Sequence, residues 1–254
     1  MSDTQSANIS RVDFDAFIFD LDGVITDTAT THRRAWKEVF DEFMERHQEG
    51  EFRPFSDDDY RRYVDGKPRF DGVRSFLFSR GIDLEEGTNT DEPGFTSVYG
   101  LGMEKNKRYQ KRLAKGEIDV LQDSLDFLKK VKRAGFSTAL VSSSQNAALV
   151  LDTLGIADYF EVRVDGVTLV EQDMAGKPAP DMFLEAAIGL DVAPKRAVVI
   201  EDAESGVQAG RAGGFGLVIG LAKGADERRE LKEHGADLAV ETLAAVDVEE
   251  IASQ

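Results

Sequence analysis

Hydrophobic positions along the chain follow two patterns, and each pattern predicts a different kind of element. Short apolar runs that begin and end abruptly are typical of strands buried in a parallel sheet. The clearest run starts at Ala16 and ends after Phe19, directly before two aspartates. Later runs of the same kind cover residues 136–141, 159–164, 197–200, 215–219 and 238–240. Helical spacing of apolar residues separates these runs, which predicts an α/β fold, a Rossmann-like doubly wound parallel sheet with helices on both faces.

The stretch from about residue 26 to residue 115 contains helical periodicity and no strand pattern. Helices are expected over 27–44, from Ser56 to about Val64, over 69–79 and over 98–114. Ser56 can cap the N-terminus of a helix, and the three aspartates that follow it would stabilise the positive end of the helix dipole. We therefore predict a small helical domain at 27–115, inserted after the first strand of a core domain that comprises 1–26 and 116–254.

Two carboxylates, Asp20 and Asp22, follow the first strand, with Gly23 behind them. Ligands of open α/β sheets bind at the carboxyl ends of the strands. A carboxylate there can attack a phosphoryl group, and a second one beside it can donate and accept protons. A strand end followed by an Asp-Gly turn is the alternative, and it is a common one. An apolar strand that runs directly into Asp-Leu-Asp-Gly-Val is much more specific.

Other predicted strand ends also carry chemistry. The strand over 136–141 leads into Ser142, Ser143 and Ser144, whose hydroxyls and amides can hold a phosphate oxygen or simply cap the next helix. Lys177 is followed by Pro178, and Pro180 comes two residues later. The prolines stiffen the loop, so the ammonium could offset the charge of a nucleophile and a phosphate, although an exposed turn is the alternative.

A second acidic pair, Glu201 and Asp202, ends the strand over 197–200. Mg²⁺ prefers one or two carboxylates together with water and a substrate phosphate, so this pair predicts a magnesium site. Acidic capping of the following helix explains the pair equally well in isolation. Each of these motifs alone can be explained structurally. Charged groups at three strand ends are much harder to explain as a coincidence.

Composition limits the remaining function classes. The 254 residues carry a formal charge of −17, which argues against nucleic acid and anionic membranes as partners. The absence of cysteine excludes disulfides and thiolate-bound metals and fits a cytoplasmic protein. No apolar run approaches the length of a membrane span. The polar residues Met1 to Ser10 lack the apolar centre of a signal peptide, and we expect a frayed lead-in there.

Taken in order, these motifs resemble those of the haloacid dehalogenase superfamily of phosphotransferases. The four matching features are Asp20-Leu-Asp-Gly-Val, Ser142, Lys177 and the Glu201-Asp202 pair. The similarity spans nearly the whole chain, and the helical insertion resembles the small cap domain of that superfamily. Within it, the β-phosphoglucomutases are more similar still, because Thr28, His32 and Arg34-Ala-Trp36 follow the first motif in the same way.

The resemblance implies roles for the core residues. Asp20 would be the nucleophile and Asp22 the general acid and base. Asp20, the backbone carbonyl of Asp22 and Asp202 would hold Mg²⁺, with Glu201 beside it. Ser142 and Lys177 would bind the transferring phosphate.

The resemblance also implies roles for residues of the cap and of the serine loop. Thr28 and His32 would steer Asp22 or the sugar, and Lys105 would face the sugar. Arg69, Ser143, Ser144 and Asn146 would bind the substrate, chiefly its distal phosphate. Without the resemblance, His32 is as well explained as a structural histidine, Trp36 as cap core, and Arg69 and Lys105 as surface charges.

Two departures from that pattern bear on the substrate. Gln145 stands where the mutases carry a lysine, and the loops near residues 45–57 and 85–94 are longer. The leading hypothesis is interconversion of β-glucose 1-phosphate and glucose 6-phosphate by a monomeric enzyme. A sugar-phosphate phosphatase is the alternative, and a non-catalytic phosphate-binding protein is a remote third.

Overall fold

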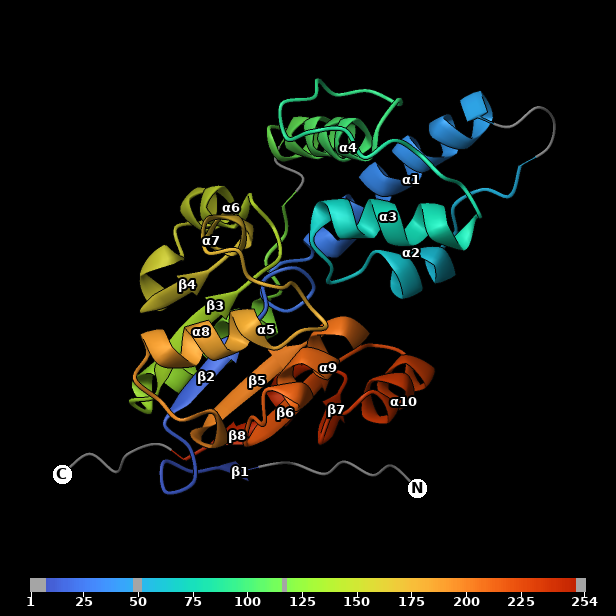
Figure 1. Ribbon diagram of the computed structural model, residues 1–254. Coiled ribbons are helices and arrows are strands. Elements are labelled where there is room, and N and C mark those ends of the chain that lie inside the picture. The colour runs from blue at the N-terminus through green and yellow to red at the C-terminus, as the bar shows by residue number, and fades with distance from the viewer. Residues whose placement is uncertain (1–7, 48–51, 116–117, 250–254) are drawn as a thin grey trace. The chain divides into compact units, whose positions relative to one another are not determined.

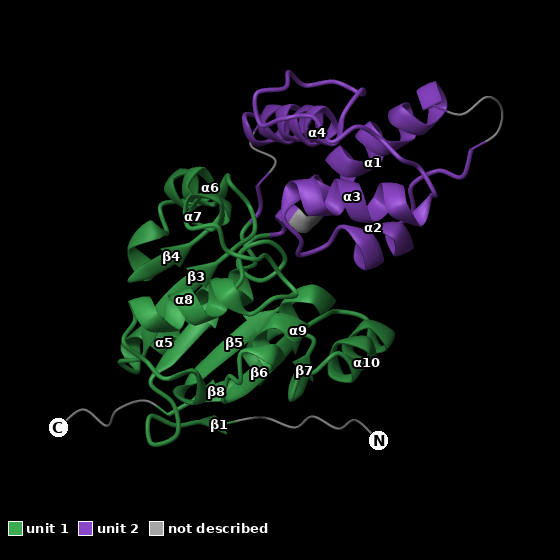
Figure 2. Ribbon diagram, viewed as in Figure 1, with its two compact units in different colours: residues 1–26, 120–254 green, residues 27–119 purple. Residues whose placement is uncertain are grey.

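The chain folds into two compact units, described here from a computed structural model over residues 8–47, 52–115 and 118–249. Unit 1 comprises Met1–Thr26 and Val120–Gln254, and unit 2 is Asp27–Asp119 (Figure 2). Within the described ranges, strands lie only in unit 1, and unit 2 is helical. No helix in these ranges is both long and apolar enough to cross a membrane.

Unit 1 is built on a six-stranded parallel sheet in the order β4-β3-β2-β5-β6-β7 (Figure 1). Its strands are β2 (Ala16–Phe19), β3 (Ser137–Val141), β4 (Val162–Val164), β5 (Ala197–Glu201), β6 (Leu217–Leu221) and β7 (Leu238–Val240). The chain moves outward from β2 to β4 and then returns to the other side of β2 to form β5, β6 and β7. The strand order therefore reverses between β2 and β5, where doubly wound sheets bind their ligands. The predicted doubly wound α/β fold is confirmed.

Helices cover both faces of this sheet, with α8 and α9 in front and α5 behind in Figure 1. The helices of unit 1 are α5 (Gln122–Arg133), α6 (Ala147–Leu154), α7 (Gly166–Glu171), α8 (Asp181–Gly189), α9 (Glu204–Ala212) and α10 (Ala225–Glu233). Three short 3-10 turns accompany them, η1 (Ala157–Tyr159), η2 (Pro194–Arg196) and η3 (Leu243–Ala245).

The central strand β2 has no exposed face, which explains its wholly apolar sequence. Ile18 belongs to the cluster that includes Phe183 of α8. Phe17 points to the other face, where its ring meets Phe127 of α5 at 5.7 Å and Phe136 at 5.0 Å between centroids. Burial on both sides holds the end of β2 rigidly, and Asp20 follows directly.

Some short elements depart from the predictions. Residues 8–9 form β1 (Asn8–Ile9), which pairs in parallel with β8 (Asp247–Val248), so a frayed lead-in up to Ser10 is wrong for these residues. The rest of that lead-in, residues 1–7, lies outside the described residues. A two-residue strand has no periodicity to detect, and its partner lies near the other end of the chain. Helix α7 was not predicted either, because its six residues are too few to show a clear periodicity.

Unit 2 packs its helices around an aromatic core. They are α1 (Thr28–His47), α2 (Asp57–Tyr63), α3 (Arg69–Ser79) and α4 (Val98–Leu113). Ser56 caps α2 as predicted, in a reciprocal capping box with Asp59. Phe40 of α1 lies 4.0 Å from Phe76 of α3, measured between ring centroids. Trp36 is buried in the same cluster, in agreement with its prediction as core.

The two segments that join the units are paired with each other. Thr26 and Val120 form an isolated antiparallel bridge, and the Leu121 amide donates to the Ile25 carbonyl at 2.9 Å. The Thr26 hydroxyl also donates to the carbonyl of Leu21 at 3.1 Å. Hydrogen bonds therefore connect these joining segments to the loop that carries Asp20 and Asp22.

Candidate active site

Strand register brings Asp20 and Glu201 to the same edge of the sheet. Phe19 of β2 is paired with Ile200 of β5, so the next residue of each strand lies beside the other. The Asp20 amide donates to the Ile200 carbonyl at 3.0 Å, which continues the ladder by one step. Two carboxylates therefore meet at the point where the strand order reverses.

Lys177 lies between these two carboxylates. Its Nζ is 2.5 Å from Asp20 Oδ1 and 2.5 Å from Glu201 Oε1. The ammonium also lies over the ring of Phe183, 5.0 Å from the centroid. Lys177 is 2% exposed, so this lysine is not part of an exposed turn. The sequence alternative of a surface loop is wrong at this position.

The charges of this cluster shift one another strongly. Burial raises the pKa of Asp20 well above its usual range, Lys177 opposes that shift, and Glu201 and Asp22 add to it. Burial by itself would lower the pKa of Lys177, but Asp20 and Glu201 outweigh it and raise the pKa above the ordinary lysine value. Lys177 is therefore a permanent cation, whereas the Asp20 carboxylate needs more positive charge than Lys177 provides in order to stay ionised.

Asp202 completes an acidic group that could hold a metal ion. One ligand oxygen from each of Asp20, Glu201 and Asp202 lies within 4.8 Å of the others. Three carboxylates against the single ammonium of Lys177 leave two negative charges when all are ionised, which one divalent cation balances. The donors are all hard oxygen atoms, the set that Mg²⁺ prefers. The residues present thus fit the expected ion.

Two glycines make this packing possible. Gly23 has a positive φ of 94°, and a Cβ there would lie 1.7 Å from Asp202 Oδ2. At Gly206 of α9, a Cβ would lie 1.8 Å from Glu201 Oε1. No larger residue fits at either position without moving a carboxylate. The sequence predicts a tight turn at Gly23. For Gly206 the sequence offers only a weak signal, its position shortly after the second acidic pair.

Asp22 faces Ser142 across the neighbouring strand end. The Ser142 hydroxyl is 3.4 Å from Asp22 Oδ2, and the Ser142 amide donates to Val164 of β4 at 3.0 Å. Asp22 is half-buried, unlike Asp20. The structure therefore places the two aspartates in different surroundings, a condition for different roles in proton transfer.

The serine loop after β3 is shaped by its own hydrogen bonds. The Ser144 amide donates to Ser142 Oγ at 3.1 Å, and the Asn146 amide donates to Ser144 Oγ at 3.2 Å. Gly166 of α7 supports the loop from outside, because a Cβ there would lie 2.5 Å from the carbonyl oxygen of Ser143. Sequence reasoning missed Gly166, for which an Asp-Gly pair after β4 was the available signal.

In unit 2, His32 and Lys105 lie together inside the helical core. Lys105 Nζ is 2.6 Å from His32 Nδ1, and the His32 ring lies 3.9 Å from that of Tyr109 between centroids. Burial, with help from Lys105 and Arg69, lowers the pKa of His32 well below its ordinary value. The ring is therefore neutral, and Nδ1 accepts a hydrogen bond from the ammonium. Thr28, at the start of the same helix α1, is fully buried.

Arg69 begins α3 and reaches across to α4. Its guanidinium donates to Asn106 Oδ1 at 2.9 Å and lies 3.7 Å from Met103 Sδ. Among the described residues no carboxylate forms an ion pair with Arg69. Burial lowers the pKa of Arg69 to about 10. A half-buried cation without a carboxylate partner is stabilised when an anion joins it, which is consistent with a phosphate site.

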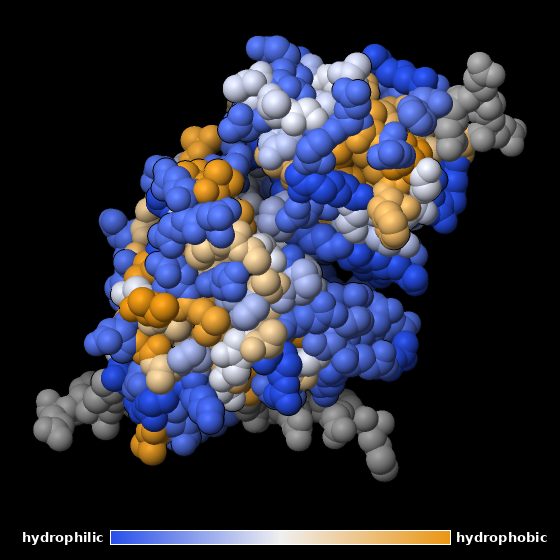
Figure 3. All heavy atoms as spheres, viewed as in Figure 1, coloured by the Kyte–Doolittle hydropathy of each residue, from blue (hydrophilic) through white to orange (hydrophobic). Residues whose placement is uncertain are grey.

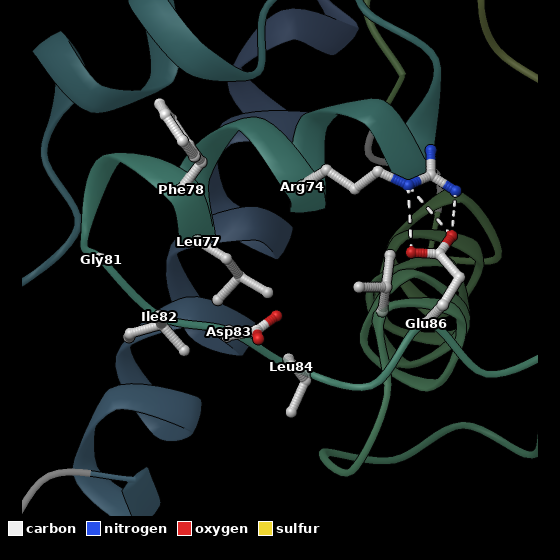
Figure 4. A pocket seen from close by; sticks show the side chains of 9 residues that line it. Arg74, Leu77, Phe78, Gly81, Ile82, Asp83, Leu84 and Glu86 are labelled. Carbon is white, nitrogen blue, oxygen red and sulfur yellow. Dashed lines mark hydrogen bonds and ion pairs between the residues drawn. The ribbon is translucent and has the colours of Figure 1, made fainter.

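A separate pocket of about 440 Å³ lies within unit 2 and is formed mainly by α3 and the segment after it (Figure 4). Leu77, Ile82 and Leu84 line it, and the ion pair of Arg74 and Glu86 borders one end. Hydrophobic side chains reach the surface over this region (Figure 3). None of the predicted site residues lines the pocket, and its single cation is already paired, so it is not a phosphate site.

Comparison with known proteins agrees with these motifs. Residues 14–214 match the family model described as haloacid dehalogenase-like hydrolase. The β-phosphoglucomutase of Mycobacterium bovis is 49% identical over 235 residues, which cover 90% of each chain. The β-phosphoglucomutase of Bacillus subtilis is 35% identical and covers 92% of each chain.

A solved structure has the same architecture. The crystal structure of the β-phosphoglucomutase from Clostridium difficile matches with a TM-score of 0.72 and 27% identity. The match covers 90% of this chain and 91% of that one. Similarity thus extends through both units, and the predicted resemblance is confirmed.

Proposed function

Because the chain belongs to the haloacid dehalogenase-like hydrolase family, we propose that it is an enzyme that transfers phosphoryl groups through an aspartyl-phosphate on Asp20. Its reaction is the interconversion of β-glucose 1-phosphate and glucose 6-phosphate through the 1,6-bisphosphate. The observation that carries this proposal is the buried ammonium of Lys177, 2.5 Å from the Asp20 carboxylate at the edge of the sheet. Similarity to β-phosphoglucomutases through both units supports the choice of substrate.

The chemistry divides between the two aspartates. Phosphorylated Asp20 gives its phosphoryl group to the 6-hydroxyl of β-glucose 1-phosphate, and Asp22 accepts the hydroxyl proton. The bisphosphate then reorients, and its 1-phosphoryl group moves to Asp20. Asp22 returns the proton to the sugar oxygen, and glucose 6-phosphate leaves. Lys177 offsets the charge that builds up on the phosphoryl oxygens.

Asp20, Asp202 and the backbone carbonyl of Asp22 hold Mg²⁺ in this proposal, with Glu201 beside them. When bound, the ion supplies neutralising charge for the phosphoryl group. The packing of Asp202 against Gly23 keeps its carboxylate next to the loop of Asp22. The two excess negative charges of the cluster favour a divalent ion over a monovalent one.

The remaining residues bind and orient the sugar phosphate. Ser142 holds the transferring phosphate, while Ser144, Asn146 and Arg69 hold the distal one, and Ser143 binds the substrate beside them. Thr28, His32 and Lys105 orient the sugar or Asp22. The cation of Arg69, which lacks a carboxylate partner among the described residues, supports its assignment to an anion.

The protein acts as a monomer in the cytoplasm, on a small sugar phosphate and on neither nucleic acid nor membranes. Its formal charge of −17 supports the exclusion of nucleic acid and of anionic membranes, since like charges repel. A sugar-phosphate phosphatase shares the same first step, with water in place of the sugar hydroxyl as the acceptor. The description of the family as hydrolases is consistent with the phosphatase alternative.

One assay distinguishes the two reactions. β-Glucose 1-phosphate is supplied with Mg²⁺ and a trace of glucose 1,6-bisphosphate, and glucose 6-phosphate and free phosphate are followed separately. We expect glucose 6-phosphate as the main product. Free phosphate alone would identify a phosphatase, and neither product over a panel of sugar phosphates would identify a binding protein.

A further inference from the structure

The first turn of α3 packs against one face of α4. Tyr99, Gly102 and Asn106 are spaced three and four residues apart, so they lie on the same face of that helix. The Phe70 ring lies 4.2 Å from the Tyr99 ring between centroids, and the Arg69 guanidinium donates to Asn106 Oδ1 at 2.9 Å. One face of α4 therefore receives two consecutive side chains of α3.

Gly102 is buried within this face and has no room for a side chain. A Cβ there would lie 2.6 Å from both Cδ1 and Cε1 of Phe70 and 3.3 Å from Cδ of Arg69. Carbon atoms do not approach one another to 2.6 Å without a shift. The Phe70 ring therefore rests directly on the backbone of α4, and any larger residue at position 102 must move the ring.

A glycine inside a helix needs an explanation of this kind. Glycine destabilises a helix relative to alanine, because it loses more conformational freedom when the chain folds. Gly102 stands in the second turn of the 16-residue helix α4, where alanine would favour the helix more. The close approach of Phe70 gives the reason for glycine at this position.

The Phe70 ring also borders the guanidinium of Arg69. The guanidinium carbon lies 5.7 Å from the centre of the ring, within the range of a cation–π contact. Met103 Sδ is 3.7 Å from Arg69 Nη1. A ring, a thioether and the amide oxygen of Asn106 thus surround the cation, and none of these three groups is charged. They can fix the direction of Arg69 without neutralising it.

We propose that Phe70 and Gly102 are positioning residues that set the direction in which Arg69 meets the distal phosphate of the substrate. Gly102 lets the Phe70 ring lie against α4, and the ring, together with Asn106, holds the guanidinium. This role rests on the proposed function, because it takes the phosphate as the partner of Arg69. Recognition of the distal phosphate then depends on how α3 packs on α4, and neither Phe70 nor Gly102 has to touch the substrate.

Steady-state kinetics of Gly102→Ala are the first test. The added methyl group displaces the Phe70 ring and with it Arg69, so the KM for β-glucose 1-phosphate should rise about tenfold. Phosphorylation of Asp20 by acetyl phosphate at saturating Mg²⁺ should stay within about twofold of the wild type, because that donor has no distal phosphate. A wild-type KM, or an equal loss with both phosphoryl donors, would overturn the proposal.

Gly72→Ala is the matched control. Gly72 is a buried glycine of α3, but a Cβ there would make only ordinary contacts, the nearest at 3.4 Å from Cγ1 of Val64. This variant should keep the wild-type KM. A KM raised as much as in Gly102→Ala would mean that any added methyl group in these helices disturbs binding, and would contradict a specific role for Gly102.

A double-mutant cycle shows whether Gly102 acts through the ring and the guanidinium. In a Phe70→Ala or an Arg69→Met background, Gly102→Ala should change the KM by less than about twofold, because the group that it displaces is gone. An undiminished tenfold effect in either background would overturn the proposal. Unfolding temperatures check that each variant is folded. Phe70→Ala serves alone if Gly102→Ala does not fold, and a wild-type KM of Phe70→Ala would contradict the positioning role.

Arg69→Met separates failure of this inference from failure of the proposed function. If Arg69→Met raises the KM and Gly102→Ala does not, only the positioning role is wrong. If Arg69→Met leaves the KM unchanged, Arg69 does not bind the distal phosphate, and both the site and the positioning role are wrong. If the wild type proves to be a phosphatase, the same comparison is made with the sugar phosphate that it hydrolyses.

Discussion

Two cations, the buried Lys177 of unit 1 and the half-buried Arg69 of unit 2, have opposite kinds of neighbours. Lys177 contacts two carboxylates, and its pKa is raised above the ordinary lysine value. Arg69 contacts the amide oxygen of Asn106 and the sulfur of Met103, and burial lowers its pKa to about 10. The first cation is balanced inside the protein, whereas the second is balanced by no carboxylate of the described residues.

The difference extends to their neighbours. The cluster in unit 1 is acidic, with Asp20, Glu201 and Asp202 close together. The cluster in unit 2 is basic, with Lys105 beside the neutral ring of His32. An acidic centre with one fixed ammonium suits a nucleophile and a cation, and a basic centre suits a phosphate ester. We therefore expect unit 1 to carry out the chemistry and the basic centre of unit 2 to bind the substrate.

Removal of the nucleophile is the strongest test of this division. Asp20→Ala should lower turnover at least about 10⁴-fold, because no other group can carry the phosphoryl intermediate. Lys177 keeps Glu201 as a partner, so the protein should still fold, which a melting curve checks. The matched control is Asp126→Asn, a change of an exposed residue of α5, for which wild-type turnover is expected. If turnover survived in Asp20→Ala, Asp20 would not be the nucleophile, and the acidic centre of unit 1 would not carry out the chemistry.

Gly23→Ala sharpens the account of the acidic centre. Its methyl group would lie 1.7 Å from Asp202 Oδ2, so the carboxylate must move. We expect weaker Mg²⁺ binding and a loss of activity of about 100-fold, the effect of displacing a catalytic group by about 1 Å. Calorimetry and steady-state kinetics measure the two quantities.

Gly155→Ala is the control for backbone strain. Gly155 also has a positive φ, 65°, but among the described residues no atom beyond Gly155 and its chain neighbours lies within 4 Å of a Cβ added there. This variant should lose only about 1 kcal/mol of stability and keep its Mg²⁺ affinity. Equal effects of the two substitutions on Mg²⁺ binding would mean that strain, not the contact with Asp202, explains the loss.

Arg69→Met tests the basic centre. Loss of a charged hydrogen bond to phosphate costs about 2 kcal/mol, so the KM for β-glucose 1-phosphate should rise about 30-fold. Phosphorylation of Asp20 by acetyl phosphate, which has no distal phosphate, should be nearly unchanged. Arg62→Met, an exposed arginine paired with Asp58, is the control and should leave KM as it is. A similar loss with both phosphoryl donors would argue against a distal phosphate site.

The smallest effect concerns His32 and pH. Because the folded-state pKa of His32 is lowered, the unfolded chain binds the proton more readily, and stability falls as pH drops below about 6.5. Between about pH 7 and pH 5 this histidine should cost roughly 1–2 kcal/mol of unfolding free energy. In His32→Gln, whose amide oxygen can still accept from Lys105, that part of the pH dependence should vanish.

Urea unfolding at several pH values measures the effect on stability. His47→Gln, at the exposed end of the same helix, is the control and should keep the wild-type slope. If His32→Gln also kept that slope, His32 would not be held neutral by the fold.

Sequence was sufficient where chemistry sits at the end of a rigid strand. The buried run before Asp20 and the acidic pair at the end of β5 identified the acidic centre, because parallel strands must bring their ends together. A helix with a clear start and stop, Arg69–Ser79, was predicted with the observed bounds. Local signals and the requirements of the sheet agreed at these places.

Sequence was insufficient where contacts between distant elements decide. Nothing near Glu201 shows that its oxygens are taken by Lys177 and two amides. Asn106 and Tyr109 of α4 have no motif, and only the packing of α4 reveals that they meet Arg69 and His32. The pairing of β1 with β8 joins opposite ends of the chain across two residues each, too short for any pattern.

Mass spectrometry of the phosphorylated enzyme tests the central claim most directly. The protein is mixed with Mg²⁺ and glucose 1,6-bisphosphate, quenched within one turnover and digested. The account predicts one phosphoryl group on the peptide that contains Asp20, and none in the Lys177→Met variant quenched at the same time. A phosphoryl group on another residue, or turnover with an unmodified Asp20 at every quench time, would contradict it.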